Sequence, residues 1–299
     1  MNRFLFTVSA FALALSTGPV VAADLPYRKA PPPTYYAPAP IANWTGFYAG
    51  LNAGGTFGGS DNVNVATGVF GPGVDAAALG AVGSGVGNAN FGGFIGGGQI
   101  GYNYQFSPAV VAGFEADIQG LAGGGGTSSF SVASPGALNP THTFGGTVSA
   151  SQSLDYLGTV RGRIGYLFTP SLLVYATGGL AYGGANLNSS FSATEMNAAG
   201  AFVGSAFGGV SQSNTQVGWT VGGGLEWMFA HNWSAKVEYL YYDLGTLSVS
   251  GPVQYANSVT GATGFGASQT SAQFNGHIVR AGVNYHFNWA APAPILAKY

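Results

Sequence analysis

The 299-residue sequence contains no cysteine, and this absence excludes disulfide bonds and thiolate metal sites. Charged residues are also scarce, at 6% of the chain, and eight basic and ten acidic residues leave a formal net charge of -2. No basic stripe is available to neutralise phosphates, which argues against nucleic acid as a partner. A protein that is dispersed in water usually carries more charge on its surface than this, so the deficit needs a physical explanation.

Long hydrophobic runs are missing as well. After the first 22 residues no uninterrupted apolar run reaches about 18 residues, which is the length that a transmembrane helix needs. The opening segment has Arg3, an apolar stretch from Phe4 to Leu15, and small residues up to Ala23. This pattern predicts a cleaved signal peptide over residues 1–22. If the mature chain crosses a membrane, it crosses as strands.

The next segment, residues 23–43, is rich in proline and tyrosine and includes Pro31, Pro32 and Pro33. Proline-rich chains favour an extended polyproline conformation over a packed one. We therefore predict a periplasmic spacer over residues 23–43 and a separate C-terminal periplasmic tail over residues 288–299.

Between these ends, the sequence has 51 glycines and is 46% hydrophobic, and amphipathic runs alternate with gaps that are short or long in turn. The short gaps are residues 106–109, 168–171 and 229–232; the long gaps lie near 55–90, 122–153, 184–215 and 245–276. Three tight turns and four long loops require eight strands, with all the tight turns on one rim. We predict an all-β fold over residues 44–287: an eight-stranded antiparallel up-and-down transmembrane β-barrel with short periplasmic turns and long, mobile extracellular loops.

The charged residues of the predicted strands all occupy one face. Where the strands alternate between lipid-compatible and polar residues, every charge falls at the polar position, which faces the lumen of a barrel. Eight-stranded barrels have an interior that side chains just fill, and burying unpaired charges is costly. The parity predicts a paired ionic plug formed by Glu115, Asp117, Arg161, Arg163, Glu226, Lys236, Glu238 and Arg280.

Aromatic residues gather near the short-turn ends of the predicted strands, as in the girdle that marks a membrane interface. This predicted girdle runs from Trp44 and Phe47 at the start of the barrel to Tyr285 and Phe287 at its end. Tyr182, Trp219, Tyr239 and Tyr241 predict the opposite girdle. The final strand alternates strictly and closes on two aromatics, as a terminal outer-membrane strand does.

Four stretches, WTGFYAG (44–50), GFIGGGQIGYN (93–103), LGTVRGRIGY (157–166) and YATGGLAYG (175–183), resemble the small porin-like, immunogenic outer-membrane proteins of alphaproteobacteria. The resemblance covers residues 44–287. It implies a small barrel of the membrane-anchor type in the cell outer membrane, surrounded by outer-membrane lipid and lipopolysaccharide and inserted by the barrel assembly machinery. The assembly signal would be Arg280, Gly282, Tyr285 and Phe287, although family members commonly stop at the aromatic that is here Phe287.

Some relatives in this family are attached covalently to peptidoglycan through a mature N-terminus that begins Ala-Asp. Cleavage after Ala22 leaves Ala23 and Asp24 at that position. The resemblance thus implies a tether, for which a spacer of polyproline geometry supplies roughly 60 Å of reach. The alternative is a free mature terminus that binds nothing.

No catalytic motif, metal site or cofactor is predicted, since His142, His231, His277 and His286 lack metal-ligand spacing. Two weaker hypotheses remain: a rim site in which His277 joins Asp155 or Asp243, and a haem held between His142 and His277. The main prediction is a non-enzymatic structural barrel that supports envelope integrity, and the alternative is a narrow porin-like channel for small solutes.

Overall fold

The computed structural model describes residues 43–59, 62–89 and 92–287. The predicted signal peptide, the spacer before residue 43 and the C-terminal tail lie outside the described residues, and so do Ala23 and Asp24. No helix within the described residues is long and apolar enough to cross a membrane.

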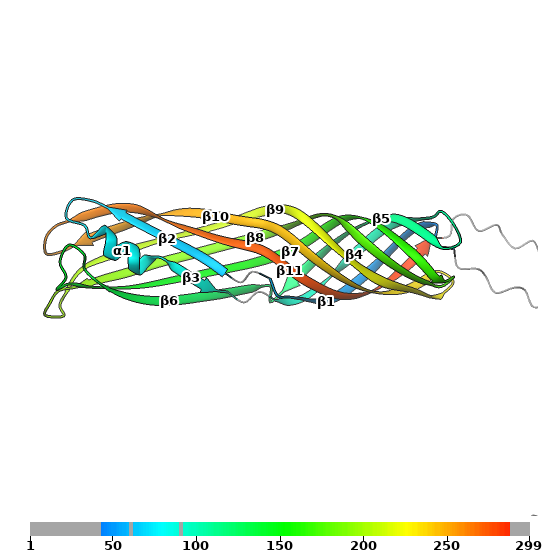
Figure 1. Cartoon of the computed structure of the whole chain (residues 1–299), viewed down its shortest axis with the longest axis horizontal. Helices are drawn as coiled ribbons and strands as arrows, with labels where there is room; N and C mark the ends of the chain where they lie inside the picture. Colours follow the sequence, from blue (N-terminus) through cyan, green and yellow to red (C-terminus); the bar gives the residue numbers. More distant parts are fainter. Residues whose placement is uncertain (1–42, 60–61, 90–91, 288–299) are drawn as a thin grey trace, which may run out of the picture. The chain divides into compact units, whose positions relative to one another are not determined.

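Eight antiparallel strands form a closed ring, which confirms the predicted barrel (Figure 1). Their order around the ring is β1, β4, β5, β7, β8, β9, β10 and β11, and β1 pairs with β11 to close it, with Gly54 opposite Arg280. The strands are β1 (Gly46–Phe57), β4 (Gly93–Gln105), β5 (Val110–Ala122), β7 (Thr143–Thr169), β8 (Leu172–Met196), β9 (Phe202–Ala230), β10 (Trp233–Asn257) and β11 (Thr263–Phe287).

The predicted tight turns and the predicted parity both appear in the structure. The connections β4–β5, β7–β8 and β9–β10 span only residues 106–109, 170–171 and 231–232. At the end of β11, Arg280, Asn284 and His286 are buried while Val279 and Val283 are exposed. The alternation therefore separates a lumen face from a lipid face, and lipid on the outer face accounts for the shortage of charge.

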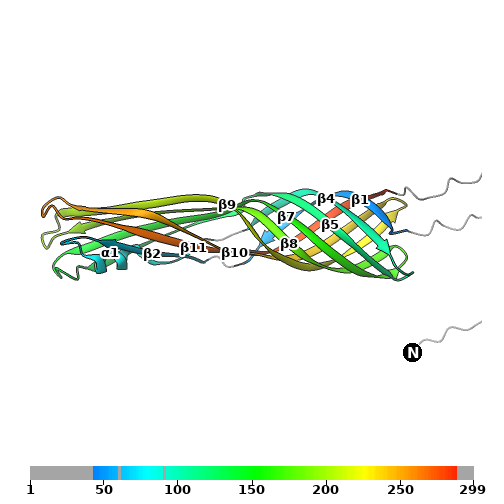
Figure 2. The same ribbon diagram turned by 90° about the horizontal axis from the view of Figure 1, so that it is seen from above.

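The long connections differ from the prediction of mobile loops. Strands β7 to β11 are 25 to 29 residues long, whereas β1, β4 and β5 have only 12 or 13, so the longer strands run far beyond the shorter ones (Figure 2). Most of residues 143–153, 184–215 and 245–276 is strand, and the tips reduce to residues 136–142, 197–201 and 258–262. In these segments small residues alternate with apolar ones. Because successive side chains of a strand point to opposite faces, this alternation is typical of a strand.

Three further strands replace the short ones above the membrane barrel. β6 (Gly125–Pro135) pairs with β7 where β5 has ended, and β2 (Asn62–Phe70) pairs with β11 where β1 has ended. β3 (Gly85–Asn88) pairs with β2. We call this upper structure, residues 62–89, 125–154, 184–215 and 246–274, the outer extension.

The outer extension encloses apolar side chains and a helix. α1 (Ala76–Gly83) begins at Asp75, whose Oδ1 accepts the N–H of Ala78 at 3.1 Å. Leu79 and Val82 of α1 belong to one buried cluster with Phe144, Val148 and Phe191 from β7 and β8. This helix was not predicted from the sequence, although an N-cap aspartate before an alanine-rich run was the available signal.

An extension built of strands predicts a restricted pattern of proteolysis. We expect proteinase K, added to intact cells that display the protein, to spare the paired strands β6 to β11 and to cut between them only at the tips 136–142, 197–201 and 258–262, because paired strands resist entry into a protease site. Mass spectrometry of the fragments gives the cleavage sites, and heat-unfolded protein in detergent is the control that is cut throughout. Early cleavage inside residues 184–196 or 246–257 would contradict the strand assignment.

Candidate functional site

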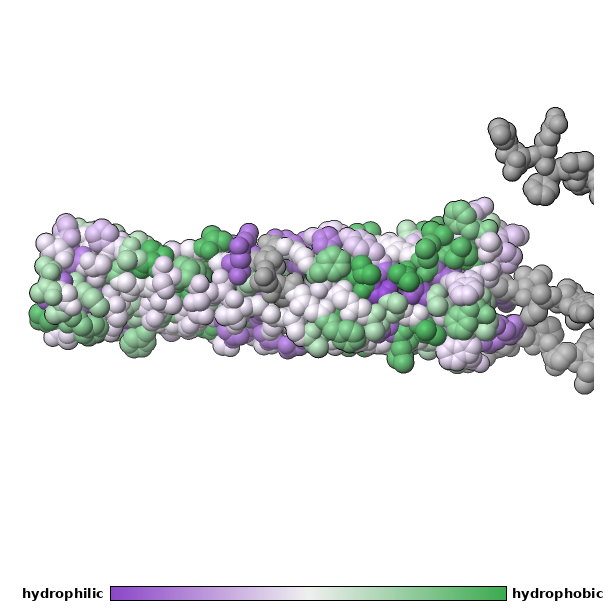
Figure 3. Space-filling model, turned by 90° about the horizontal axis from the view of Figure 1, so that it is seen from below, coloured by the Kyte–Doolittle hydropathy of each residue, from purple (hydrophilic) through white to green (hydrophobic). Residues whose placement is uncertain are grey.

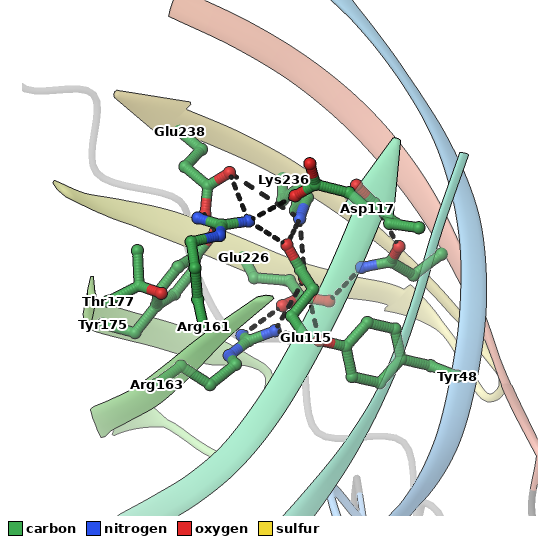
Figure 4. Close-up of polar contacts among 12 residues, drawn as sticks. Tyr48, Glu115, Asp117, Arg161, Arg163, Tyr175, Thr177, Glu226, Lys236 and Glu238 are labelled. Atoms are coloured by element: carbon green, nitrogen blue, oxygen red, sulfur yellow. Dashed lines mark hydrogen bonds and ion pairs between the residues drawn. The ribbon is translucent and has the colours of Figure 1, made fainter. Parts of the chain in front are cut away.

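The structure brings all eight predicted lumen charges into one buried cluster (Figure 4). They come from five strands, β5, β7, β9, β10 and β11, and the charged side chains in the ion pairs of this cluster are only 0–2% exposed. We call this cluster the ion network; its members are Glu115, Asp117, Arg161, Arg163, Glu226, Lys236, Glu238 and Arg280.

Arg161 on β7 lies at the centre of the ion network. Its Nη2 donates to Glu115 Oε1 at 2.5 Å and to Asp117 Oδ2 at 2.8 Å, and its Nη1 donates to Glu238 Oε1 at 2.9 Å. Its Nε donates to Thr159 Oγ1 at 2.9 Å. One guanidinium thus joins carboxylates on β5 and on β10, which lie on opposite sides of β7 in the ring.

Arg280 on β11 forms a second bridge to the same acids. Its Nη2 donates to Glu238 Oε2 at 2.6 Å and to Asp117 Oδ2 at 2.8 Å, and its Nε donates to Glu238 Oε2 at 2.8 Å. Asp117 and Glu238 are therefore each shared by two arginines. The planar guanidinium suits such sharing because its donors lie in a fixed fork.

Lys236 and Arg163 satisfy the remaining carboxylates. Lys236 Nζ lies 2.8 Å from both oxygens of Glu115, and Arg163 Nη2 donates to Glu226 Oε2 at 2.6 Å. The Arg163 guanidinium also stacks over Tyr175, with its Cζ 4.2 Å from the ring centroid. With four acids and four bases in contact, the ion network carries no formal net charge.

Neutral polar side chains extend the ion network to the other strands. Tyr48 on β1 donates to Glu115 Oε2 at 2.8 Å, and Tyr175 on β8 donates to Glu238 Oε1 at 3.1 Å. Gln99 on β4 donates to Asn284 Oδ1 at 2.6 Å, and Asn284 donates to Glu226 Oε1 at 2.7 Å. Every strand of the ring therefore contributes to one connected polar core.

Glycine on β4 makes this packing possible. A Cβ atom at Gly101 would lie 2.3 Å from the Tyr48 ring, so any larger residue would displace the phenol that donates to Glu115. Sequence reasoning predicted the charges but missed Tyr48 and Tyr175. The available signal was that both tyrosines fall at lumen-facing positions in parts of β1 and β8 that carry no charge.

Apolar layers close the lumen on both sides of the ion network. On the side of the outer extension, Ile95, Leu157, Leu240 and Ile278 are at most 1% exposed and belong to the same apolar cluster as the core of the extension. On the side of the short turns, a second cluster contains Trp44, Val111, Leu167, Leu173, Tyr175 and Met228. The ion network is thus enclosed between two apolar layers.

Exposed aromatic rings surround the barrel at the levels where the girdles were predicted. Phe47 and Tyr102 contact each other edge to face near the short turns, as do Trp233 and Tyr285, and Trp219 contacts Tyr241 near the outer extension. Trp44 was predicted to belong to the girdle, and this prediction is wrong. Its side chain is fully buried, and its Nε1 donates to Pro170 O at 3.0 Å. Figure 3 shows the hydrophobic side chains on the outside of the barrel.

The two histidines of the haem hypothesis, His142 and His277, contact different partners in the structure. His142 Nδ1 lies 2.7 Å from Glu195 Oε1 at the far end of the outer extension, whereas His277 Nδ1 lies 2.6 Å from Tyr239 OH at its base. Glu195 also accepts from Tyr255, and Tyr255 follows Tyr239 by most of the length of β10. The two histidines therefore do not meet, and the haem hypothesis is wrong in its geometry.

Glu195 lies in the segment 184–215, for which a mobile extracellular loop was predicted, and its environment shows that this prediction is wrong. Glu195 is buried, and it accepts hydrogen bonds from Tyr255 and from Asn257 Nδ2, the latter at 2.9 Å. Burial, reinforced by the hydrogen bond to Glu195, raises the pKa of Tyr255 to about 12. Tyr255 is therefore protonated, and remains a donor, throughout the physiological range.

In the rim hypothesis His277 was to join Asp155 or Asp243, but among the described residues it is bonded to Tyr239 and forms no ion pair with either acid. Asp243 Oδ1 accepts the N–H of Gly245 at 2.8 Å, and Asp155 is exposed on β7. His286 lies in the lumen, where its Nε2 is 2.9 Å from Ser234 Oγ and 3.5 Å from Glu226 Oε1.

The four residues of the predicted assembly signal lie on the strand that closes the ring. Arg280 and Gly282 face the lumen, and Tyr285 and Phe287 face outward with ring centroids 5.2 Å apart. Their role in assembly stays a prediction. Lipopolysaccharide also stays a predicted partner, and every Lys and Arg among the described residues is committed to the ion network.

A closed ring of antiparallel strands with a lipid-compatible exterior and a polar, filled interior defines an outer-membrane β-barrel protein. The chain belongs to the family described as Outer membrane protein beta-barrel domain, which it matches over residues 11–287. It is 34% identical over 277 residues to the 31 kDa outer-membrane immunogenic protein of Brucella melitensis, a match that covers 89% of this chain and 93% of that relative. The protein is therefore located in the outer membrane.

Two further comparisons give more limited similarity. The 22 kDa outer membrane protein of Rhizobium leguminosarum bv. viciae is 32% identical over 149 residues, which cover 49% of this chain and 52% of that relative. Among solved structures, the outer membrane protein OprG from Pseudomonas aeruginosa aligns over 83% of this chain and 99% of its own, with 8% identity and a TM-score of 0.36.

Substitution of Arg161 tests whether the ion network stabilises the barrel. We expect Arg161→Leu to lower the unfolding free energy by about 3–5 kcal/mol, because three carboxylates lose a buried partner. The folded fraction in detergent is measured during urea titration, by the change in gel mobility between folded and unfolded barrels. Val160→Leu, on the exposed face next to it, is the matched control.

The double variant Arg161→Leu, Glu238→Gln makes this test specific for pairing. Removing one acid together with the base restores neutrality. The double variant should therefore lose less unfolding free energy than the sum of the losses of the two single variants. Full additivity, or a midpoint for Arg161→Leu equal to that of the Val160→Leu control, would show that the ion network is not a paired plug.

Proposed function

We propose that this protein is a structural outer-membrane barrel that supports envelope integrity and is joined to peptidoglycan through Ala23 of the mature chain. The observation that carries the proposal is the closed lumen: an ion network with 0–2% exposed side chains lies between two apolar layers. A barrel whose interior is filled by its own side chains leaves no path for a solute, and this suits a role as an anchor in the membrane.

The start of the described chain is fixed to the barrel at the rim of the short turns, which suits a tether that begins there. Trp44 enters the barrel from the rim of the short turns, which faces the periplasm in outer-membrane barrels. Its indole is bonded to Pro170 of the β7–β8 turn, and Thr45 Oγ1 accepts the N–H of Gln105 at 3.0 Å. Force applied through residues 23–43 would thereby reach β1, β4 and the β7–β8 turn.

Mass spectrometry of N-terminal peptides from lysozyme-digested envelopes tests the tether. We expect a muropeptide bound to the amino group of Ala23. A chain with Asp24→Lys is the control: its barrel should fold and show normal heat-modified gel mobility, while the muropeptide-linked peptide is lost. A free terminus in every preparation of the unaltered chain would remove the tether from the proposal and leave the barrel as a membrane anchor alone.

The alternative of a narrow channel finds less support. Passage of a solute through the ring would require the ion pairs of Arg161 and Arg280 to open and the apolar layer at Leu157 and Leu240 to separate. In planar bilayers we therefore expect no defined conductance steps from the purified barrel, with a general porin as the positive control. Regular single-channel steps that scale with protein concentration would favour the channel.

A further inference from the structure

The tips of the outer extension expose large apolar side chains that its fold leaves uncovered. Six of them are 43–72% exposed, and they lie at or beside the ends of β2, β8, β9 and β11 or in the tips that connect the strands. Figure 3 shows hydrophobic side chains at this end of the extension. We call the set the apolar crown: Phe70, Leu138, Met196, Phe202, Val259 and Phe265.

Neighbouring contacts join the members of the apolar crown. Met196 lies opposite Phe202 in the β8–β9 pairing, and Phe70 lies opposite Phe265 in the β2–β11 pairing. The tip that carries Val259 is bonded to β9 beside Phe202, because Ser258 N donates to Val203 O at 2.9 Å. The crown is therefore a ring of adjacent tips.

The protein's own membrane cannot cover the apolar crown. On β8 the outer girdle residue Tyr182 precedes Met196 by more than half of the strand, which at ~3.3 Å per residue is roughly 45 Å of chain. Lipid explains exposed apolar residues on the barrel wall, but it does not explain these. Exposed apolar patches of this kind mark sites of interaction.

The surface around the apolar crown carries no exposed formal charge within the described part of the outer extension. Its two acids, Asp75 and Glu195, are each 6% exposed and fully engaged, and its Lys and Arg content is nil. The described part of the outer extension therefore offers no Lys or Arg to an acidic partner. A neutral surface also enters an interface without the cost of desolvating a charge.

The tips are held in place before any partner arrives. Asn197 Oδ1 accepts the N–H groups of Ala199 and Ala201, both at 3.0 Å, and Asn257 Oδ1 accepts those of Val259 and Thr260, both at 2.9 Å. Asp75 Oδ2 accepts the N–H of Leu138 at 2.9 Å. The side chains of the crown are thus presented on ordered turns, which reduces the entropy lost on binding.

The arrangement favours a lipid surface over a protein as the partner. Each tip projects only one or two large apolar side chains from turns of small residues, whereas a stable protein interface requires a continuous complementary face of about 800 Å² per partner. Separate projections enter the fluid headgroup region of a bilayer without matching its shape. We propose that the apolar crown inserts into the interface of a second, electrically neutral lipid bilayer and so brings the outer membrane into contact with it.

Flotation with phosphatidylcholine vesicles tests this assignment. The full barrel, held in a nanodisc that stands for its own membrane, is mixed with the vesicles at 0.15 M and at 1 M NaCl. We expect equal binding at both salt concentrations, because no ion pairs are involved. The triple variant Phe202→Ser, Val259→Ser, Phe265→Ser should reduce the bound fraction at least tenfold.

The matched control is Phe207→Ser, which removes an equally exposed phenylalanine from the side of β9 and should leave binding unchanged. Heat-modified gel mobility verifies that each variant is folded. Equal binding by the crown variant and the parent would overturn the proposal, as would an absence of binding by the parent. Pairing of nanodiscs with one another without vesicles would identify a second copy of the chain as the partner instead. Each outcome is independent of whether Ala23 is attached to peptidoglycan.

Discussion

Burial of eight formal charges inside a ring of eight strands is the constraint on which the rest of this structure depends. An isolated buried ion costs several kcal/mol, so each carboxylate must find a cation, and every strand must hold its register for the contacts to form. Arg161 and Arg280 meet this demand by sharing Asp117 and Glu238. The close approach of Tyr48 to Gly101 follows from the same demand, because the donors around Glu115 leave no room for a side chain there.

The transition from the membrane barrel to the outer extension takes place at two irregularities in the strands. The β7–β8 register shifts between Leu154 and Leu157, and the β10–β11 register shifts between Asp243 and Thr246. An extra residue at such a bulge reverses which parity faces inward, and bulges are common at the rims of barrels. The acidic residues Asp155 and Asp243 lie at these two shifts, where a residue turns away from both apolar interiors.

The same shifts explain which parts of the structure were predictable. Below them, one parity holds from Lys236 to Leu240, and counting charges was sufficient to place the ion network. Above them, the inward parity of β10 changes to Leu247 and Val249, and small polar residues between apolar ones look like a flexible loop. The partners of Glu195 lie 53 to 62 positions away in the chain, and Asp75 Oδ2 accepts from Ala137, which is 62 positions away; nothing local in the sequence indicated these contacts. Trp44 was misplaced for a related reason: an aromatic at the barrel entrance suits a girdle or a buried plug equally well, and its contact with Pro170 decides between them.

The distribution of charge gives the two ends of the barrel different chemistry. Every Lys and Arg of the described chain is used inside the membrane barrel, so the acids of the outer extension are stabilised by hydrogen bonds instead, as Glu195 is by Tyr255, Asn257 and His142. The core of the extension is continuous with the barrel through Leu157 and Ile278, and within the described residues its surface carries no exposed charge because Asp75 and Glu195 are buried. The lack of exposed charge leaves apolar contact as the means by which the distal tips bind.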